Sequence, residues 1–221
     1  MSIPAVAAQR HAVVFDCNVY LDVAEVLGEP YSLQAFNKRA AQVGRDPLPH
    51  NDSKIDSLRA LAVCTSGRFA GAETLEVWTS DHIDRMVRNK AMHPTTEDAV
   101  TGFRGLGWSQ ASAEALVDDL VYGVIDASGG GTIGQAFPDG EPPLDHEDGL
   151  VYGACREVMR ADALCRTYCV TNDRGFLSDA REGRLPDHTI VLAPARFVAL
   201  VRSARAATGM QNVVRGSGGT S

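Results

Sequence analysis

Two short segments of the chain place acidic and amide side chains directly after an apolar run. VVFDCN carries Asp16 and Asn18 in this position, and YCVTND carries Thr171 and Asp173. Apolar runs rich in β-branched and aromatic residues predict buried strands. If the two strands are neighbours, their carboxylates converge, and like charges held close together need a cation or a shared proton. Because Mg²⁺ and Mn²⁺ take oxygen ligands, the pattern predicts a metal site.

A third carboxylate stands at the start of a later helix. The segment EDGLVYGACREVMRA (residues 147–161) has the apolar periodicity of an amphipathic helix, and Asp148 lies in its first turn on the apolar side. Asp145 is the better candidate for the N-cap, because it precedes the helix and stands three residues before Asp148. Asp148 is thereby free for the site, and Asp145 and Glu147 extend an acidic rim.

The fourth carboxylate is a choice between Asp81 and Asp84 in the segment SDHIDRMVRNKAM, where Ser80 predicts an N-cap. Asp84 aligns with Val87 and Ala91, beside the apolar ridge of the expected helix. Asp81 faces the polar side, where the helix dipole alone explains an acidic residue. We therefore favour Asp84 as the inward carboxylate.

Four carboxylates around one or two divalent ions suit phosphodiester hydrolysis, because such ions acidify water and neutralise charge on the phosphate. The predicted catalytic residues are Asp16, Asp84, Asp148 and Asp173, and the predicted metal ligands are Asp16, Asp148 and Asp173. Asn18 and Thr171 would orient Asp16. A single aspartate after a strand is more often a turn or cap residue, but three at matching places are harder to explain in this way. His82 and His146 flank these acids and are expected to be surface or capping-region residues rather than catalytic bases.

Strands and helices alternate along the chain. The predicted strands are 12–17, 75–79, 168–171 and 189–193, with a further short strand in the glycine- and proline-rich segment 128–145. The predicted helices are 19–27, 32–43, 53–69 with Ser53 as its cap, one from Ser80, one from Ser109 past Leu120, 147–161, a short helix between the last two strands, and 194–204. This order is typical of an α/β fold with a mostly parallel sheet, in which sites form at the carboxyl ends of the strands.

The 221 residues suit one domain. We place it at residues 1–205, with helical insertions at about 30–70 and 95–128, and expect 206–221 to be a disordered tail. The five cysteines contain no C-x-x-C pair and are expected to be small core residues. Because no apolar run reaches the ~20 residues of a membrane span and the first residues lack a secretory pattern, we expect a cytoplasmic protein.

The formal net charge of −7 makes the chain a poor default binder of nucleic acid, because contacts to phosphate carry most of that affinity. Four arginines that lie close together in the sequence offer a local exception: Arg156, Arg160, Arg166 and Arg174. They form either a basic rim or a solvated helix face. Arg156 and Arg174 are the candidate RNA contacts.

Three segments, VVFDCNVYL, DHEDGLVYGA and CVTNDRGFL, resemble in this order the signature segments of PIN-domain nucleases. Many members of that family are VapC-type toxins of bacterial toxin–antitoxin pairs. The family pattern has Asp-x-Asn after the first strand, a Glu on a central helix, an Asp at the start of a later helix and Thr-x-Asp after a later strand. The positions that match are Asp16, Asn18, Asp148, Thr171 and Asp173.

The resemblance implies a three-layer α/β/α fold and endoribonuclease activity that depends on Mg²⁺ or Mn²⁺. It also implies RNA as substrate and, for a toxin, an antitoxin that docks near the acids; a homodimer is a further expectation. The chain departs from the pattern because no glutamate stands at the expected point of the helix from Ser80, so Asp84 would substitute with a shorter side chain. It is also longer than the compact toxins.

Two other functions stay open. A phosphatase with an aspartate nucleophile also begins with an aspartate after a strand, but its chemistry needs a second acid two residues later, and Asn18 cannot transfer a proton. A non-catalytic binding module would keep the fold without the fourth acid, and failure to bind Mn²⁺ would favour it.

Overall fold

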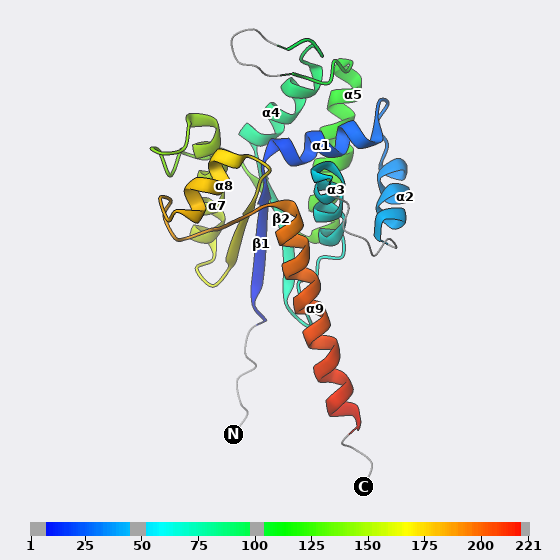
Figure 1. The fold of residues 1–221 in the computed structure, drawn as a ribbon, viewed down its shortest axis with the longest axis vertical. Helices are drawn as coiled ribbons and strands as arrows, with labels where there is room; N and C mark the ends of the chain where they lie inside the picture. Colours follow the sequence, from blue (N-terminus) through cyan, green and yellow to red (C-terminus); the bar gives the residue numbers. More distant parts are fainter. Residues whose placement is uncertain (1–7, 45–51, 98–103, 218–221) are drawn as a thin grey trace.

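The computed structural model describes residues 8–44, 52–97 and 104–217, and its centre is a five-stranded parallel sheet (Figure 1). The strand order is β3-β2-β1-β4-β5. The strands are β1 (Arg10–Phe15), β2 (Thr74–Ser80), β3 (Gly131–Ile133), β4 (Arg166–Val170) and β5 (Ile190–Leu192). The α/β class and the short strand expected in 128–145 are therefore confirmed.

Helices cover both faces of the sheet and make three layers. The helical segments are α1 (Cys17–Leu27), α2 (Leu33–Gly44), α3 (Ser53–Cys64), α4 (Asp81–Met92), α5 (Gln110–Ala115), the π-helical η1 (Leu116–Val121), α6 (Tyr122–Ser128), α7 (His146–Ala161), α8 (Arg174–Arg181) and α9 (Pro194–Ser217). In Figure 1, α7 and α8 lie on one side of the sheet, and α1, α3 and α9 lie on the other. The three-layer α/β/α architecture agrees with the expected fold class.

The register of the central strands decides which side chains meet at the carboxyl edge. β1 pairs with β4 in parallel, with Phe15 opposite Val170, and the Asp16 amide continues the ladder by donating to the Val170 carbonyl at 3.0 Å. The strands that precede Asp16 and Thr171 are therefore direct neighbours. The polar residues that follow β1 and β4 therefore lie next to each other at the carboxyl edge of the sheet, as a shared site requires.

Two of the three N-caps expected from hydroxyl residues are confirmed. Ser80 accepts a hydrogen bond from the Ile83 amide, and Ser109 accepts one from Ser112. The prediction for α3 was wrong, because Asp52 is the N-cap and accepts from the Lys54 amide, so Ser53 is the first residue of the helix. A carboxylate at this position serves the same orphan amides as a hydroxyl does.

The predicted ends of two helices also differ from the structure. The third helix stops at Cys64 rather than near Phe69, because the chain turns at Gly67, whose φ of +62° favours glycine. The last helix runs on to Ser217, through the segment expected to be a tail. In Figure 1 it projects away from the sheet. Residues 218–221 of that expected tail, and 98–103 of the second expected insertion, lie outside the described residues.

The expected insertions form part of the hydrophobic core. Four side chains of the π-helical segment, Leu116, Val117, Leu120 and Val121, are fully buried. Ser128, at the end of α6, accepts a hydrogen bond from the Val77 amide of β2 at 2.9 Å. The pairing of β2 with β3 begins only at Trp78, so a side chain of α6 supplies the hydrogen-bond partner of the Val77 amide.

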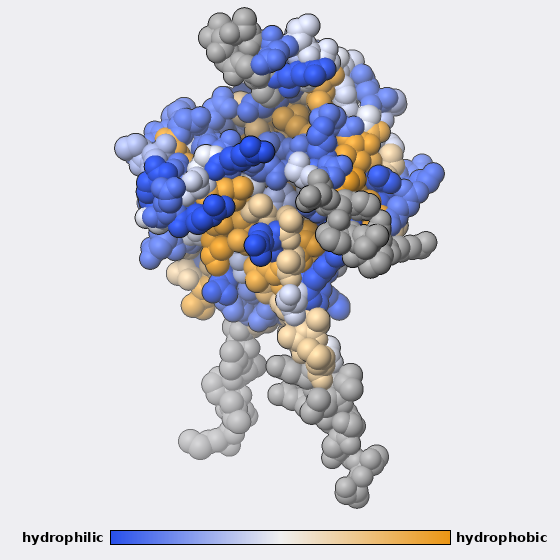
Figure 2. Space-filling model, viewed as in Figure 1, coloured by the Kyte–Doolittle hydropathy of each residue, from blue (hydrophilic) through white to orange (hydrophobic). Residues whose placement is uncertain are grey.

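The remaining features of composition fit this architecture. The five cysteines are buried free thiols, as expected for small core residues. Figure 2 shows hydrophilic residues over most of the face it presents and hydrophobic residues around the first turns of α9. Among the described helices, none combines the length and apolar character needed to cross a membrane.

Gly153 allows α7 to lie against the segment that precedes it. A substitution of Gly153 by alanine is therefore expected to lower stability, although alanine normally stabilises a helix relative to glycine. A Cβ at Gly153 would come within 1.9 Å of the Phe137 carbonyl oxygen, whereas one at Gly123 of α6 would meet Leu33 at an ordinary 3.7 Å. We expect Gly153→Ala to lower the free energy of unfolding by about 1–3 kcal/mol through overpacking. Gly123→Ala should be neutral or raise it by up to about 1 kcal/mol through helix propensity. Urea unfolding of both variants checks this, and equal stabilisation by both would contradict it.

Candidate active site

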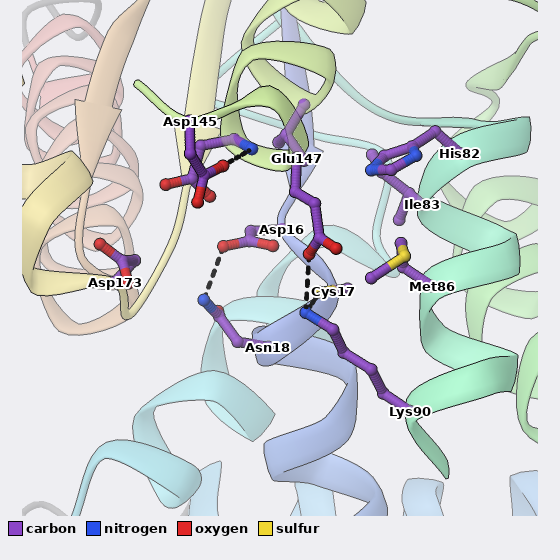
Figure 3. Close-up of a pocket in the computed structure, with 12 residues that line it drawn as sticks. Asp16, Cys17, Asn18, His82, Ile83, Met86, Lys90, Asp145, Glu147 and Asp173 are labelled. Atoms are coloured by element: carbon purple, nitrogen blue, oxygen red, sulfur yellow. Dashed lines mark hydrogen bonds and ion pairs between the residues drawn. The ribbon is translucent and has the colours of Figure 1, made fainter. Parts of the chain in front are cut away.

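A polar pocket opens at the carboxyl edge of the sheet, where β1, α4, α7 and the loop after β4 meet (Figure 3). Its lining is Asp16, Cys17, Asn18, His82, Ile83, Met86, Lys90, Asp145, Glu147, Asp148, Val151 and Asp173. The three expected metal ligands, Asp16, Asp148 and Asp173, are all present in this lining. They come from three elements that are distant in the sequence.

Asp16 is held in place by two side chains that the sequence also singled out. Its Oδ2 accepts hydrogen bonds from Asn18 Nδ2 at 2.6 Å and from Thr171 Oγ1 at 2.7 Å. Thr171 is fully buried and Asp16 is only 4% exposed. Two donors on one oxygen fix the direction of the carboxylate, which is the orienting role expected of Asn18 and Thr171.

The loop after β4 is anchored on both sides of Asp173. Thr171 Oγ1 accepts from the Asp173 amide at 2.9 Å, and Asp173 Oδ1 caps α8 by accepting from Phe176 at 2.8 Å. Between them, Asn172 Nδ2 donates to Asp22 Oδ2 at 2.6 Å and lies 2.9 Å from Ser57 Oγ. The Asn172 side chain therefore ties the loop to α1 and α3, a contact that the spacing of Thr171 and Asp173 did not reveal.

The start of α7 brings the third carboxylate. Asp145 caps the helix by accepting from the Asp148 amide at 2.9 Å, so the N-cap expected of Asp145 is confirmed, and Asp148 lines the pocket. Burial, together with the charges of Asp16, Asp145 and Asp173, raises the pKa of Asp148 to about 7. Burial and the neighbouring carboxylates therefore both disfavour the ionised form of Asp148.

Asp84 does not join this group. Its side chain points inward, as expected, and is only 6% exposed. However, Oδ1 accepts from Thr79 Oγ1 at 2.7 Å and Oδ2 accepts from Tyr122 Oη at 2.6 Å. Asp84 is absent from the pocket lining. Its hydrogen bonds join β2, α4 and α6, so the structure gives it a packing role in place of the expected fourth site carboxylate.

A different face of α4 lines the pocket. Ile83, Met86 and Lys90 recur at spacings of three and four residues and therefore share one side of the helix. Lys90 Nζ lies 3.3 Å from Glu147 Oε2 and 3.5 Å from Cys17 Sγ. The sequence prediction followed the apolar face that contains Asp84 and so missed Lys90, although the neighbouring face shows the same helical spacing.

The histidines and the candidate arginines lie in different surroundings. His82 lines the pocket, and burial followed by the charge of Arg85 lowers its pKa. His146 is exposed and pairs with Glu141. Arg156 is paired with Asp139 at 3.3 Å and Glu157 at 3.4 Å and does not line the pocket.

Arg174 is the better placed of the two arginines expected to contact RNA. It follows Asp173 directly, begins α8 and is exposed. An exposed guanidinium on the residue that follows Asp173 is suited to a phosphate, because its planar fork matches two phosphate oxygens. Arg156 is engaged with acidic neighbours and lacks that freedom.

The donor chemistry of the pocket fits a hard divalent cation. Asp16, Asp148 and Asp173 offer carboxylate oxygens, which are the ligands that hard divalent cations prefer. Within residues 8–44, 52–97 and 104–217, however, no three acidic, histidine or cysteine side chains already form a cluster that would hold a metal ion. The ligands are of the right type, but their coordination shell is not preformed.

Comparison with protein-family models, with curated proteins and with solved structures found no match to this chain.

The crowding of charge around Asp148 predicts a gain in stability when that charge is removed. Its pKa rises from 3.8 to about 7 on folding, so the folded protein binds more protons between these values and loses stability as the pH rises through them. Asp148→Asn should raise the free energy of unfolding by about 1–2 kcal/mol at pH 8, after allowance for solvent screening, and by little at pH 4.5.

Urea unfolding with a chelator present, at several pH values, measures this difference. Asp118→Asn, which alters an exposed acid of the π-helical segment, is the control and should show no such pH dependence. Parallel stability profiles for the wild-type protein and Asp148→Asn would contradict the electrostatic account.

Proposed function

We propose that this protein is a metal-dependent endoribonuclease that hydrolyses phosphodiester bonds in RNA. The observation that carries the proposal is the meeting of Asp16, Asp148 and Asp173 in one pocket at the carboxyl edge of the sheet. The same three residues occupy the positions of the PIN-domain pattern. The observed three-layer α/β/α fold is also the one that the resemblance implies.

Asp16, Asp148 and Asp173 would bind Mg²⁺ or Mn²⁺ through their carboxylate oxygens. When bound, such an ion supplies Lewis-acid polarisation of the phosphate and acidifies water. Asn18 and Thr171 keep the Asp16 carboxylate in one orientation through their hydrogen bonds to Oδ2. Arg174 is the residue best placed to bind a flanking phosphate of the RNA.

The role of the nuclease in the cell follows from the family resemblance alone. A VapC-type toxin acts in the cytoplasm and is held by an antitoxin protein. We propose the same arrangement for this chain, and a homodimer stays a prediction. Co-expression with the product of a neighbouring short gene for a DNA-binding protein, followed by size-exclusion chromatography, would test the pairing.

A non-catalytic binding module is the second candidate. It is favoured by the position of Asp84, which is committed to Thr79 and Tyr122, and by the ammonium group of Lys90 in the pocket. Loss of a fourth acid weakens metal binding, since each carboxylate contributes charge to the site. The phosphatase alternative has no such support, because Asn18 donates to Asp16 and offers no acid for proton transfer.

Cleavage of a mixed RNA pool should require Mg²⁺ or Mn²⁺ and stop when a chelator is added. Asp148→Asn should reduce the rate on the order of 100-fold or more, because it removes a metal ligand. Since this variant is expected to be more stable than the wild-type protein, its loss of activity would not come from unfolding. Asp118→Asn is the control and should cleave at the wild-type rate.

The other outcomes separate the candidates. Cleavage that persists in chelator, or at the wild-type rate in Asp148→Asn, would overturn the proposal. No cleavage together with no Mn²⁺ binding would favour the binding module. A covalent phosphate on Asp16 would favour the phosphatase.

A further inference from the structure

Lys90 brings a positive charge into the acidic pocket. Its side chain extends from α4 towards Glu147 and Cys17, beside Asp16 (Figure 3). The Lys90 side chain as a whole is mostly shielded, with an exposure of 23%. Although burial disfavours the ammonium, Cys17, Glu147 and Asp16 together raise the pKa of Lys90 above its ordinary value.

The pocket lining holds more negative than positive side chains. Among the described residues that line it, five carry carboxylates and one carries an ammonium group. The carboxylates are Asp16, Asp145, Glu147, Asp148 and Asp173. Lys90 compensates part of this charge, because its ammonium group lies 3.3 Å from Oε2 of Glu147, the residue that directly precedes Asp148.

We propose that the ammonium group of Lys90 takes the place of a second metal ion, so that the pocket binds one divalent cation and not two. The inference rests on the proposed metal-dependent activity of the same pocket. Two-metal sites hold their ions only ~4 Å apart, and each ion needs its own share of carboxylates. Lys90 occupies the Glu147 side of the pocket, which leaves Asp16, Asp148 and Asp173 for a single ion.

The simpler alternative is that Lys90 only joins α4 to α7 through its ion pair with Glu147. Under that alternative, removal of either partner would lower stability and leave metal binding unchanged. Under our proposal, Lys90 and Glu147 act on a bound cation with opposite signs. Lys90 repels the cation and Glu147 attracts it, so neutral variants of the two should shift Mn²⁺ affinity in opposite directions.

Calorimetric titration of the full chain with Mn²⁺ tests the proposal without any activity measurement. The wild-type protein should bind one Mn²⁺. Lys90→Gln should bind the first ion on the order of tenfold more tightly, or take up a second, because a nearby repulsive charge is lost. Glu147→Gln should bind it more weakly. Lys90→Arg, which keeps the charge, should match the wild-type protein in number and affinity.

Lys54→Gln provides the matched control. Lys54 also forms an ion pair with a glutamate, Glu25, but lies outside the pocket. Its loss should leave Mn²⁺ binding unchanged. Thermal melting of every variant, followed by circular dichroism, would show that each is folded.

The outcomes separate this inference from the proposed function. Two Mn²⁺ ions in the wild-type protein, or unchanged binding in folded Lys90→Gln, would overturn the role of Lys90 and leave the metal-dependent nuclease standing. No Mn²⁺ binding in the wild-type protein would overturn both. One ion in the wild-type protein, with tighter or additional binding in Lys90→Gln alone, would support the proposal.

Discussion

The parallel pairing of β1 with β4 is the constraint on which the candidate site depends. The Asp16 amide donates to the Val170 carbonyl, and on the next strand the Thr171 amide donates to Leu192 at 3.1 Å. The backbone hydrogen bonds of the sheet thus continue for one residue beyond the end of β1 and of β4. Beyond that point, side chains form the hydrogen bonds. Thr171 then donates to Asp16, so the same two segments are joined first by backbone and then by side-chain hydrogen bonds.

This geometry disfavours the ionised form of a carboxylate on α7. Once Asp16 and Asp173 are fixed at the sheet edge, the first turn of α7 adds Asp148 to a space that is already negative. The helix start favours an acid through its dipole, but burial and the neighbouring carboxylates oppose the charge. A cluster of carboxylates held in this way costs stability, a trade-off that is typical of sites organised for function rather than for stability.

The sequence predicted those parts of the site that depend on local pattern. Asp16 and Asp173 follow apolar strands, and Asp145 precedes a clear amphipathic helix, so their positions follow from periodicity and capping alone. Asp84 shows the limit of this reasoning. Helical spacing places it inward correctly, but whether it meets the pocket or another buried partner depends on Tyr122, which lies 38 positions away in the sequence.

Sequence pattern left the contacts of Lys90 and the end of α9 undecided for different reasons. A lysine side chain is long and flexible, so its Cα position on α4 does not say which carboxylate its ammonium group reaches. The continuation of α9 past Gly209 runs against the low helix propensity of glycine, so a local preference for a break did not decide the outcome. The partner of Lys90 depends on tertiary contacts, and the length of α9 depends on the residues on both sides of Gly209, so neither can be predicted from a single position.

The helical segment from α5 to α6 has a consequence for the modularity of this fold. It follows β2 and α4 as an apparent addition, yet Tyr122 donates to Asp84 and Ser128 accepts from the backbone of β2. Its removal would take one of two hydrogen-bond donors from Asp84, which keeps Thr79, and would leave the buried Val77 amide without Ser128. A shortened relative of this chain would therefore need to replace those partners when it lost the segment, so the extra length is an obligate part of the domain rather than an appendage.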